Sequence, residues 1–287
     1  MESEPQIISR PAAEAVVCES LHDFKWLTSQ QMVDLGISSP RSLRDLLPKM
    51  CRATKPLIGR ISLRFHPAKG TLPHYYFLTK HGAAYVAGLL KIPMKEVHYP
   101  RGAVSLSTDF YHRRNTVDLH IALHKWATAT DSSVEFFHTY FDKQGANHSN
   151  NQEDLLRSLT RVKLGNDFFI PDGIFKVRTA DGKDHLFVLE VYNGRNTKRV
   201  IQQLSKHVQA LEDGAFNRAY NFSSYYTVLV VFDEMNALRN VYKRLKTDSF
   251  FSDVGGYFAF ATLDRIKDSL PDRWVFLNEP TKYQSIF

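Results

Sequence analysis

Apolar and polar positions in the first ninety residues follow a helical period and then a strand period. Thr28 and Gln31 occupy the positions of a capping box at the start of a short helix. Ser39 is placed to start the next helix, with Pro40 at its first position, where proline is tolerated. The pattern predicts helices over 12–24, 28–35, 39–53 and 79–90, and strands over 57–67 and 74–79.

The rest of the chain alternates strands and helices after one long helix. That helix, over 107–129, is apolar on much of its circumference, so we expect it to be largely buried. Five strands are predicted over 134–141, 167–177, 185–191, 226–232 and 257–262, with helices over 197–211 and 235–246. The first three strands can form a meander, but the later ones need crossovers, which predicts a mixed sheet.

The length of the chain and a linker-like segment near residue 100 predict two domains. A chain of 287 residues accommodates two ordinary domains, and the segment 96–107, with proline, glycine and serines, reads as a linker. The predicted fold class is α/β (α+β), with a helical and hairpin domain over 1–95 and a mixed sheet flanked by helices over 108–287. The element order of the second domain is that of restriction-endonuclease-like nuclease cores.

Positive charge changes the interpretation of the first domain. The chain has a net charge of +7, and the stretch 41–69 alone carries this excess. Its cations lie on the third helix and on the hairpin, the two elements with which a winged helix-turn-helix contacts DNA. The predicted DNA-binding residues are Arg41, Arg44, Lys49, Arg52, Arg60, Arg64 and Lys69. The alternatives are a small helical domain with a solvated basic face and a winged helix that mediates protein contacts.

Two carboxylates on neighbouring strands give the second domain its candidate chemistry. Asp172 follows Pro171 at the start of one core strand, and Glu190 lies near the end of the next. In an antiparallel hairpin both reach one end of the sheet, where a hard cation such as Mg²⁺ or Mn²⁺ takes carboxylate ligands and promotes phosphodiester cleavage. Glu190 follows four apolar residues, where an unpaired charge is costly. The alternative is a structural Glu190 paired with an arginine or lysine.

A nuclease core of this kind usually has a lysine two residues after the second carboxylate, but this chain has Tyr192 there. On the following helix, Lys198 and Lys206 recur with Gln202 on one face and are candidates to replace that lysine. The alternative is a solvated charged face. Tyr192 itself is a candidate to donate to a phosphate or to attack it.

The long helix offers His112 and Asn115, one turn apart, as a further ligand or phosphate contact. His120 and His124 have the spacing of zinc ligands but lack a third ligand at fitting spacing. P-loop, Rossmann and nucleophile-elbow signatures are absent from the sequence, so no small-molecule cofactor is expected.

Four segments together resemble a known family. They are YYFLTKHGAAYVAGLL, YHRRNTVDLHIAL, FFIPDGIFKV and LFVLEVYNGRNT, and they resemble the replication-relaxation family of plasmids and mobile elements, which is related to the MobC class of plasmid relaxases. The resemblance covers roughly residues 25–215. It implies a restriction-endonuclease-like core that nicks DNA at an origin of transfer or replication, with His112, Asn115, Asp172 and Glu190 in the site. Tyr192 stands in the second acidic position of the family's Glu-x-Asp pattern.

The sequence therefore predicts a DNA-binding protein that recognises an origin or operator in double-stranded DNA and nicks one strand with a metal-dependent core. The alternative is a non-enzymatic replication or transcription factor with a degenerate core, and a homodimer is one option for either. The start of the chain lacks an apolar signal core, the apolar runs are too short to span a bilayer, and two cysteines provide no disulfide framework. A cytoplasmic location without a membrane partner is the expectation.

Overall fold

The chain divides into two units, Met1–Phe110 and Tyr111–Phe287. Its structure, a computed structural model, describes residues 12–62, 65–66, 70–100, 109–145, 156–279 and 282–287. The division falls just after the predicted linker 96–107, of which 101–107 lies outside the described residues.

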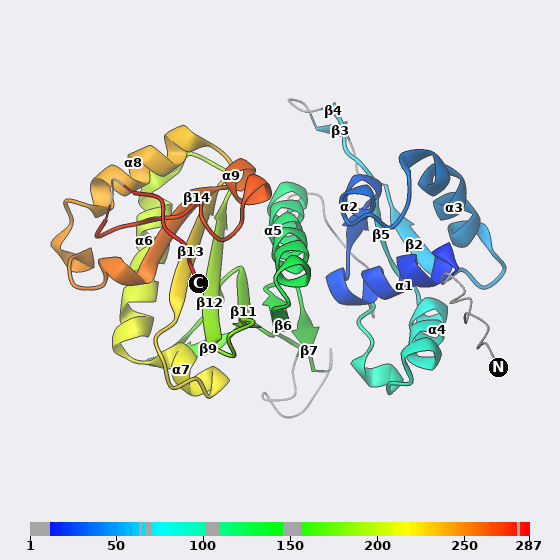
Figure 1. The fold of residues 1–287 in the computed structure, drawn as a ribbon, viewed down its shortest axis with the longest axis horizontal. Helices are drawn as coiled ribbons and strands as arrows, with labels where there is room; N and C mark the ends of the chain where they lie inside the picture. The colour runs from blue at the N-terminus through cyan, green and yellow to red at the C-terminus, as the bar shows by residue number, and fades with distance from the viewer. Residues whose placement is uncertain (1–11, 63–64, 67–69, 101–108, 146–155, 280–281) are drawn as a thin grey trace, which may run out of the picture. The chain divides into compact units, whose positions relative to one another are not determined.

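The first unit combines helices with a small antiparallel sheet (Figure 1). Its elements are α1 (Ala13–Phe24), β1 (Leu27–Thr28), α2 (Ser29–Asp34), α3 (Pro40–Arg52), β2 (Ile58–Ile61), β3 (Phe65–His66), β4 (Gly70–Thr71), β5 (Tyr75–Leu78), α4 (Lys80–Leu90) and a 3-10 turn (Met94–Glu96). The sheet has the order β1-β5-β2, and β3 pairs with β4 in a separate antiparallel hairpin.

Side-chain caps start the helices of this unit where the sequence predicts them. The Thr28 hydroxyl accepts from the Gln31 amide at 3.2 Å, and the Gln31 side chain accepts from the Thr28 amide at 2.9 Å, which confirms the capping box. The Ser39 hydroxyl accepts from the Ser42 amide at 3.2 Å and caps α3, with Pro40 at its first position. These caps fix where α2 and α3 begin.

The second unit is built around a mixed sheet. Its helices are α5 (Phe110–Ala129), α6 (Thr197–Glu212), α7 (Ala215–Tyr220), α8 (Met235–Leu245) and α9 (Leu263–Asp268). The sheet strands are β6 (Ser133–Thr139), β11 (Gly173–Arg178), β12 (Asp184–Tyr192), β13 (Thr227–Phe232), β14 (Phe258–Thr262) and β15 (Val275–Phe276). Short pairs are formed by β7 (Lys143–Gln144) with β8 (Arg157–Ser158), and by β9 (Val162–Leu164) with β10 (Asp167–Phe169).

Among the described residues this sheet has six strands in the order β15-β14-β13-β12-β11-β6. The strands β6, β11 and β12 form the predicted antiparallel meander, while β13 and β14 join β12 in parallel. Short 3-10 turns (Ser249–Phe251, Gly255–Tyr257) precede β14. The prediction of a mixed α/β protein is confirmed.

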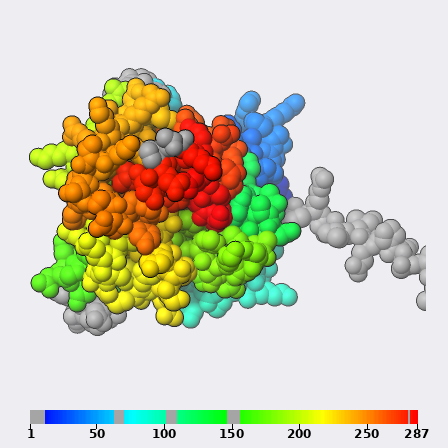
Figure 2. Space-filling model, turned by 60° about the vertical axis from the view of Figure 1, so that its left-hand side comes forward, coloured from blue at the N-terminus to red at the C-terminus, as the bar shows by residue number. Residues whose placement is uncertain are grey.

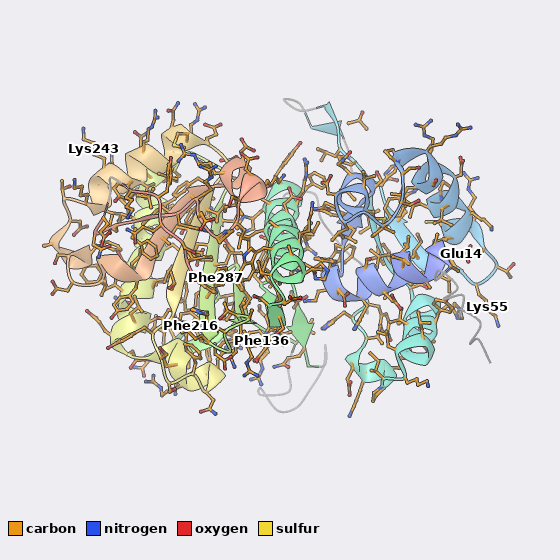
Figure 3. All side chains as sticks on the ribbon, viewed as in Figure 1. Glu14, Lys55, Phe136, Phe216, Lys243 and Phe287 are labelled. Carbon is orange, nitrogen blue, oxygen red and sulfur yellow. The ribbon has the colours of Figure 1, made fainter. Side chains whose placement is uncertain are left out.

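Helices cover both faces of the sheet (Figure 1). On one face α6, α7 and α8 enclose a core that includes Phe216 of α7 and borders Phe136 of β6 (Figure 3). On the other face α5 and α9 enclose a second core, against which Phe287 packs. Figure 2 shows one side of the second unit, with α7 in yellow and α8 in orange beside the red C-terminal segment. Buried side chains alternate between the two cores along each central strand, as the pleat requires.

The structure corrects two predicted strands. The range 57–67 contains β2, which ends at Ile61, and the separate strand β3, which pairs with β4. The range 167–177 is not continuous, because β10 ends at Phe169 and β11 begins at Gly173. Pro171 lies in the break, and proline has no N–H to donate to a sheet ladder. The break places Asp172 at the very edge of the main sheet.

Candidate functional site

The strand register brings Asp172 and Glu190 to the same edge of the sheet. Gly173 pairs with Leu189 in the antiparallel β11–β12 ladder, so the preceding Asp172 lies opposite Glu190. The parallel strands β12, β13 and β14 also end there, with Tyr192 and Phe232 in register. We call this end of the sheet the carboxyl edge. The carboxyl ends of parallel strands are where open α/β sheets commonly bind ligands.

Two residues of α5 join the carboxyl edge. His112 Nε2 lies 2.8 Å from Asp172 Oδ1, and the Val191 amide donates to Asp172 Oδ2 at 2.7 Å. Asn115 donates from Nδ2 to Asn193 Oδ1 at 2.7 Å, just past the end of β12. The structure therefore brings His112, Asn115 and Asp172 together. The His112 side chain is 27% exposed and that of Asp172 is 13% exposed, so solvent reaches this half of the edge.

Glu190, by contrast, is fully buried and both of its carboxyl oxygens are engaged. Gln203 donates from Nε2 to Oε2 at 2.9 Å, and His207 Nε2 lies 2.8 Å from Oε1. Gln203 and His207 lie one turn apart on α6, so a single helix face closes over the carboxyl group. Glu190 is thus paired inside the protein, although not with the arginine or lysine that the structural alternative named.

Burial decides the protonation of this pair. Desolvation, followed by the charge of Asp172, raises the pKa of Glu190 well above its ordinary value. Desolvation lowers the pKa of His207 to about 3. Both shifts favour a neutral carboxylic acid that hydrogen-bonds a neutral imidazole. His207 Nδ1 is buried and has no hydrogen-bond partner within the part of the chain that the structure describes.

Lys198 and Lys206, the predicted replacements for the missing lysine, make no ion pair or hydrogen bond with Asp172 or Glu190 among the described residues. Both are exposed on α6, while Gln203 and His207 occupy the positions that face Glu190. Sequence reasoning missed these two residues. His207 sits directly beside Val208 on the predicted core face of the helix, and a polar residue there is the signal that would have identified it.

Tyr192 lies on the same side of the sheet as Glu190, against Phe232 with ring centroids 5.4 Å apart. Its hydroxyl is buried and has no hydrogen-bond partner among the described residues. Desolvation, with the charges of Glu190 and Asp172, raises the pKa of Tyr192 well above its ordinary value. The phenol therefore stays protonated at neutral pH, which disfavours its use as a nucleophile.

The carboxyl edge offers one part-exposed carboxylate, Asp172, and one enclosed carboxyl group, Glu190. Mg²⁺ and Mn²⁺ take oxygen ligands such as carboxylates, so Glu190 would have to release its proton and move away from its partners to serve as a second ligand. Among the described residues there is no group of three or more histidine, cysteine, aspartate or glutamate side chains that could hold a metal ion.

The predicted DNA-binding residues of the first unit are exposed wherever the structure describes them. On α3, Leu43, Leu47 and Met50 form the buried face, and the exposed cations are Arg41, Arg44, Lys49 and Arg52. Lys49 makes a long ion pair of 3.7 Å with the half-buried Glu14 of α1. Arg60 of β2 is also exposed. Arg64 and Lys69 lie outside the described residues.

Comparison with family models, with curated proteins and with solved structures gives no match for this chain. Within the part of the chain that the structure describes, no helix is both long and apolar enough to cross a membrane.

Proposed function

We propose that this protein binds a site in double-stranded DNA through α3. The observation that carries the proposal is the row of exposed arginines on α3, opposite its buried face. Arg41, Arg44 and Arg52 have no ion-pair partner among the described residues, so their charge is available to phosphates or bases. Arginine suits this role because its planar group donates to phosphate oxygens and to guanine edges.

The surrounding elements support the same proposal. Helix α2, a short turn and α3 are followed by the strands β2 and β5, with the β3–β4 hairpin between them. This is the element order of a winged helix-turn-helix, in which the second helix of the motif enters the major groove and the hairpin contacts the neighbouring backbone. Arg60 lies on the strand that leads to the hairpin. An origin or operator of a plasmid or mobile element is the site we propose, from the resemblance to the replication-relaxation family.

For the second unit we propose a restriction-endonuclease-like core that contacts DNA without cutting it. The meander followed by two parallel strands supports the nuclease-like fold, and so does the placement of Asp172 and Glu190 at one edge. The enclosure of Glu190 by Gln203 and His207 favours the non-enzymatic reading over nicking. The hypothesis of metal-dependent nicking requires Glu190 to leave both partners and lose its proton.

Fluorescence anisotropy with labelled double-stranded DNA tests the central proposal. The variant Arg41→Ala, Arg44→Ala, Arg52→Ala should lose at least about 100-fold in affinity at constant salt, since each arginine contact contributes roughly 1–3 kcal/mol. The matched control is Lys125→Ala, Arg273→Ala, two exposed cations of the second unit without an ion pair among the described residues. Equal affinities of the α3 variant and the wild type would contradict the proposal.

A further inference from the structure

Helix α8 presents a second cationic face, far in sequence from α3. Ala237, Val241 and Leu245 form its buried side. Its exposed cations are Arg239, Lys243, Arg244 and the C-cap residue Lys246. No acidic residue lies within the helix itself. The separation of apolar and basic residues is therefore as clear as on α3.

These four cations are unpaired, unlike others of the same unit. No ion pair involves them among the described residues, whereas Lys176 and Arg178 both pair with Glu135 and Asp184 on the sheet. A cation without an internal partner retains its full attraction for an external anion.

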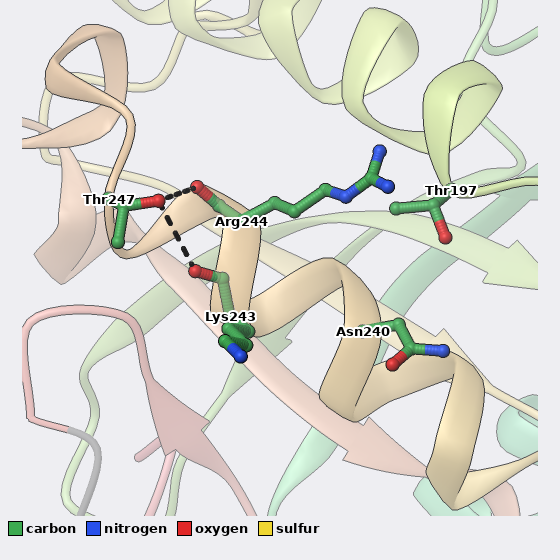
Figure 4. Close-up of a pocket in the computed structure, with 5 residues that line it drawn as sticks. All are labelled: Thr197, Asn240, Lys243, Arg244 and Thr247. Atoms are coloured by element: carbon green, nitrogen blue, oxygen red, sulfur yellow. Dashed lines mark hydrogen bonds between the residues drawn. The ribbon is translucent and has the colours of Figure 1, made fainter.

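Two of the cations line a pocket of about 450 Å³ (Figure 4). Lys243 and Arg244 share it with Thr197 at the start of α6, with Asn240 and with Thr247. Lys243 projects from α8 on the outside of the unit (Figure 3). The lining combines two positive charges with three neutral hydrogen-bonding side chains and includes no carboxylate. Phosphate oxygens match this set, because they accept from both kinds of group.

A purely structural role for these cations explains only part of the arrangement. Lys243 and Arg244 lie in the last turn of α8, where positive charge stabilises the helix dipole. Arg239 lies outside that turn, and the dipole gives no reason for Thr197 and Asn240 to gather at the same pocket.

We propose that the exposed face of α8 binds the phosphodiester backbone of the DNA that α3 recognises. This inference rests on the proposed function and assigns the second unit its own contact with the same ligand. The face reads no sequence. It adds affinity that depends on salt, since each phosphate contact releases counterions from the duplex.

The test measures DNA affinity of the full chain from 50 to 200 mM salt for the variant Lys243→Ala, Arg244→Ala. The slope of log affinity against log salt should become shallower by about 2, since each neutralised phosphate contributes about 0.9. The control Lys125→Ala, Arg273→Ala, with one lysine and one arginine elsewhere in the same unit, should keep the wild-type slope.

Comparison of the α8 variant with the α3 variant separates this inference from the proposed function. An unchanged slope in the α8 variant together with a reduced slope in the α3 variant overturns the inference and leaves the proposed function standing. The reverse result supports the α8 contact and overturns the role of α3. A lower melting temperature with an unchanged slope assigns Lys243 and Arg244 to the helix dipole and overturns the inference. An equal change in the control also overturns it, and a wild-type protein that binds no DNA overturns both proposals.

Discussion

At the scale of single residues, the Glu190 carboxyl group is the most informative feature of the second unit. Its partners are Gln203, which can only donate from Nε2, and a neutral His207, whose Nε2 can accept a hydrogen bond from the protonated acid. A glutamine at position 190 can reproduce both bonds, because its oxygen accepts and its amide nitrogen donates. An alanine reproduces neither.

We therefore predict opposite outcomes for Glu190→Gln and Glu190→Ala at neutral pH. The glutamine variant should be at least as stable as the wild type. The alanine variant should lose about 3 kcal/mol of unfolding free energy, because a cavity opens and two buried polar partners are left unsatisfied. Urea denaturation measures both. A loss of more than about 2 kcal/mol in the glutamine variant would contradict the neutral pair, since removal of one member of a buried ion pair is strongly destabilising.

The pH dependence gives the same account a second test. The folded pKa of Glu190 is raised, so the folded state keeps a proton that the unfolded state releases above its ordinary pKa of 4.5. Wild-type stability from this group is therefore full below pH 4.5 and is lost as the pH rises towards the folded pKa. His207 is present in both the wild type and the Glu190→Gln variant. We therefore take the difference between their unfolding free energies, in which the contribution of His207 cancels. The stability of Glu190→Gln relative to the wild type should thus increase between pH 5 and pH 8. A constant difference would contradict the raised pKa.

At the scale of elements, the start of α4 depends on a close backbone approach. A Cβ atom on Gly82 would lie 1.9 Å from the Leu57 carbonyl oxygen, which belongs to the backbone and cannot swing aside. Gly88 lies on the same helix, and a Cβ atom there would meet nothing within 4 Å.

Alanine at these two positions should therefore act in opposite directions. Gly82→Ala should lower the free energy of unfolding by about 3 kcal/mol through overpacking. Gly88→Ala should raise it by up to about 1 kcal/mol, because alanine has the higher helix propensity. Thermal melting of the two variants measures the difference. Similar effects of both substitutions would contradict the packing of α4 against Leu57.

Local patterns predicted most of these elements correctly. The capping box of α2, the apolar periods of α3 and α6 and the main strands are encoded within a few residues each, which is why local patterns suffice for them. The break at Pro171 was missed because the apolar run continues on both sides of it. The pairing of Glu190 with His207 was missed for a different reason. It depends on how α6 lies across the sheet, a tertiary relation that no local period contains.

At the scale of the whole molecule, charge and chemistry are placed on different elements. Most of the excess of positive charge lies on the first unit, and α8 of the second unit carries four exposed cations without an ion pair among the described residues. The carboxyl edge holds the part-exposed Asp172, the enclosed Glu190 and the buried phenol of Tyr192. From this distribution we expect a protein that holds DNA rather than one that cuts it.

Supercoiled plasmid DNA with Mg²⁺ or Mn²⁺ tests that distinction. The wild type should leave the plasmid intact at protein concentrations that saturate binding, as should Asp172→Ala, which serves as the comparison. Nicking that requires metal and disappears in both Asp172→Ala and Glu190→Ala would establish the enzymatic alternative and overturn the non-enzymatic reading.

The measurement that tests the central claim most directly is the salt dependence of DNA binding by the full chain. For the wild type, log affinity should fall steeply and linearly with log salt. Replacement of Arg41, Arg44 and Arg52 by alanine should make the slope shallower by roughly 2.7, or about 0.9 for each lost contact. A wild type that binds no duplex DNA, or an α3 variant with an unchanged slope, would contradict the account.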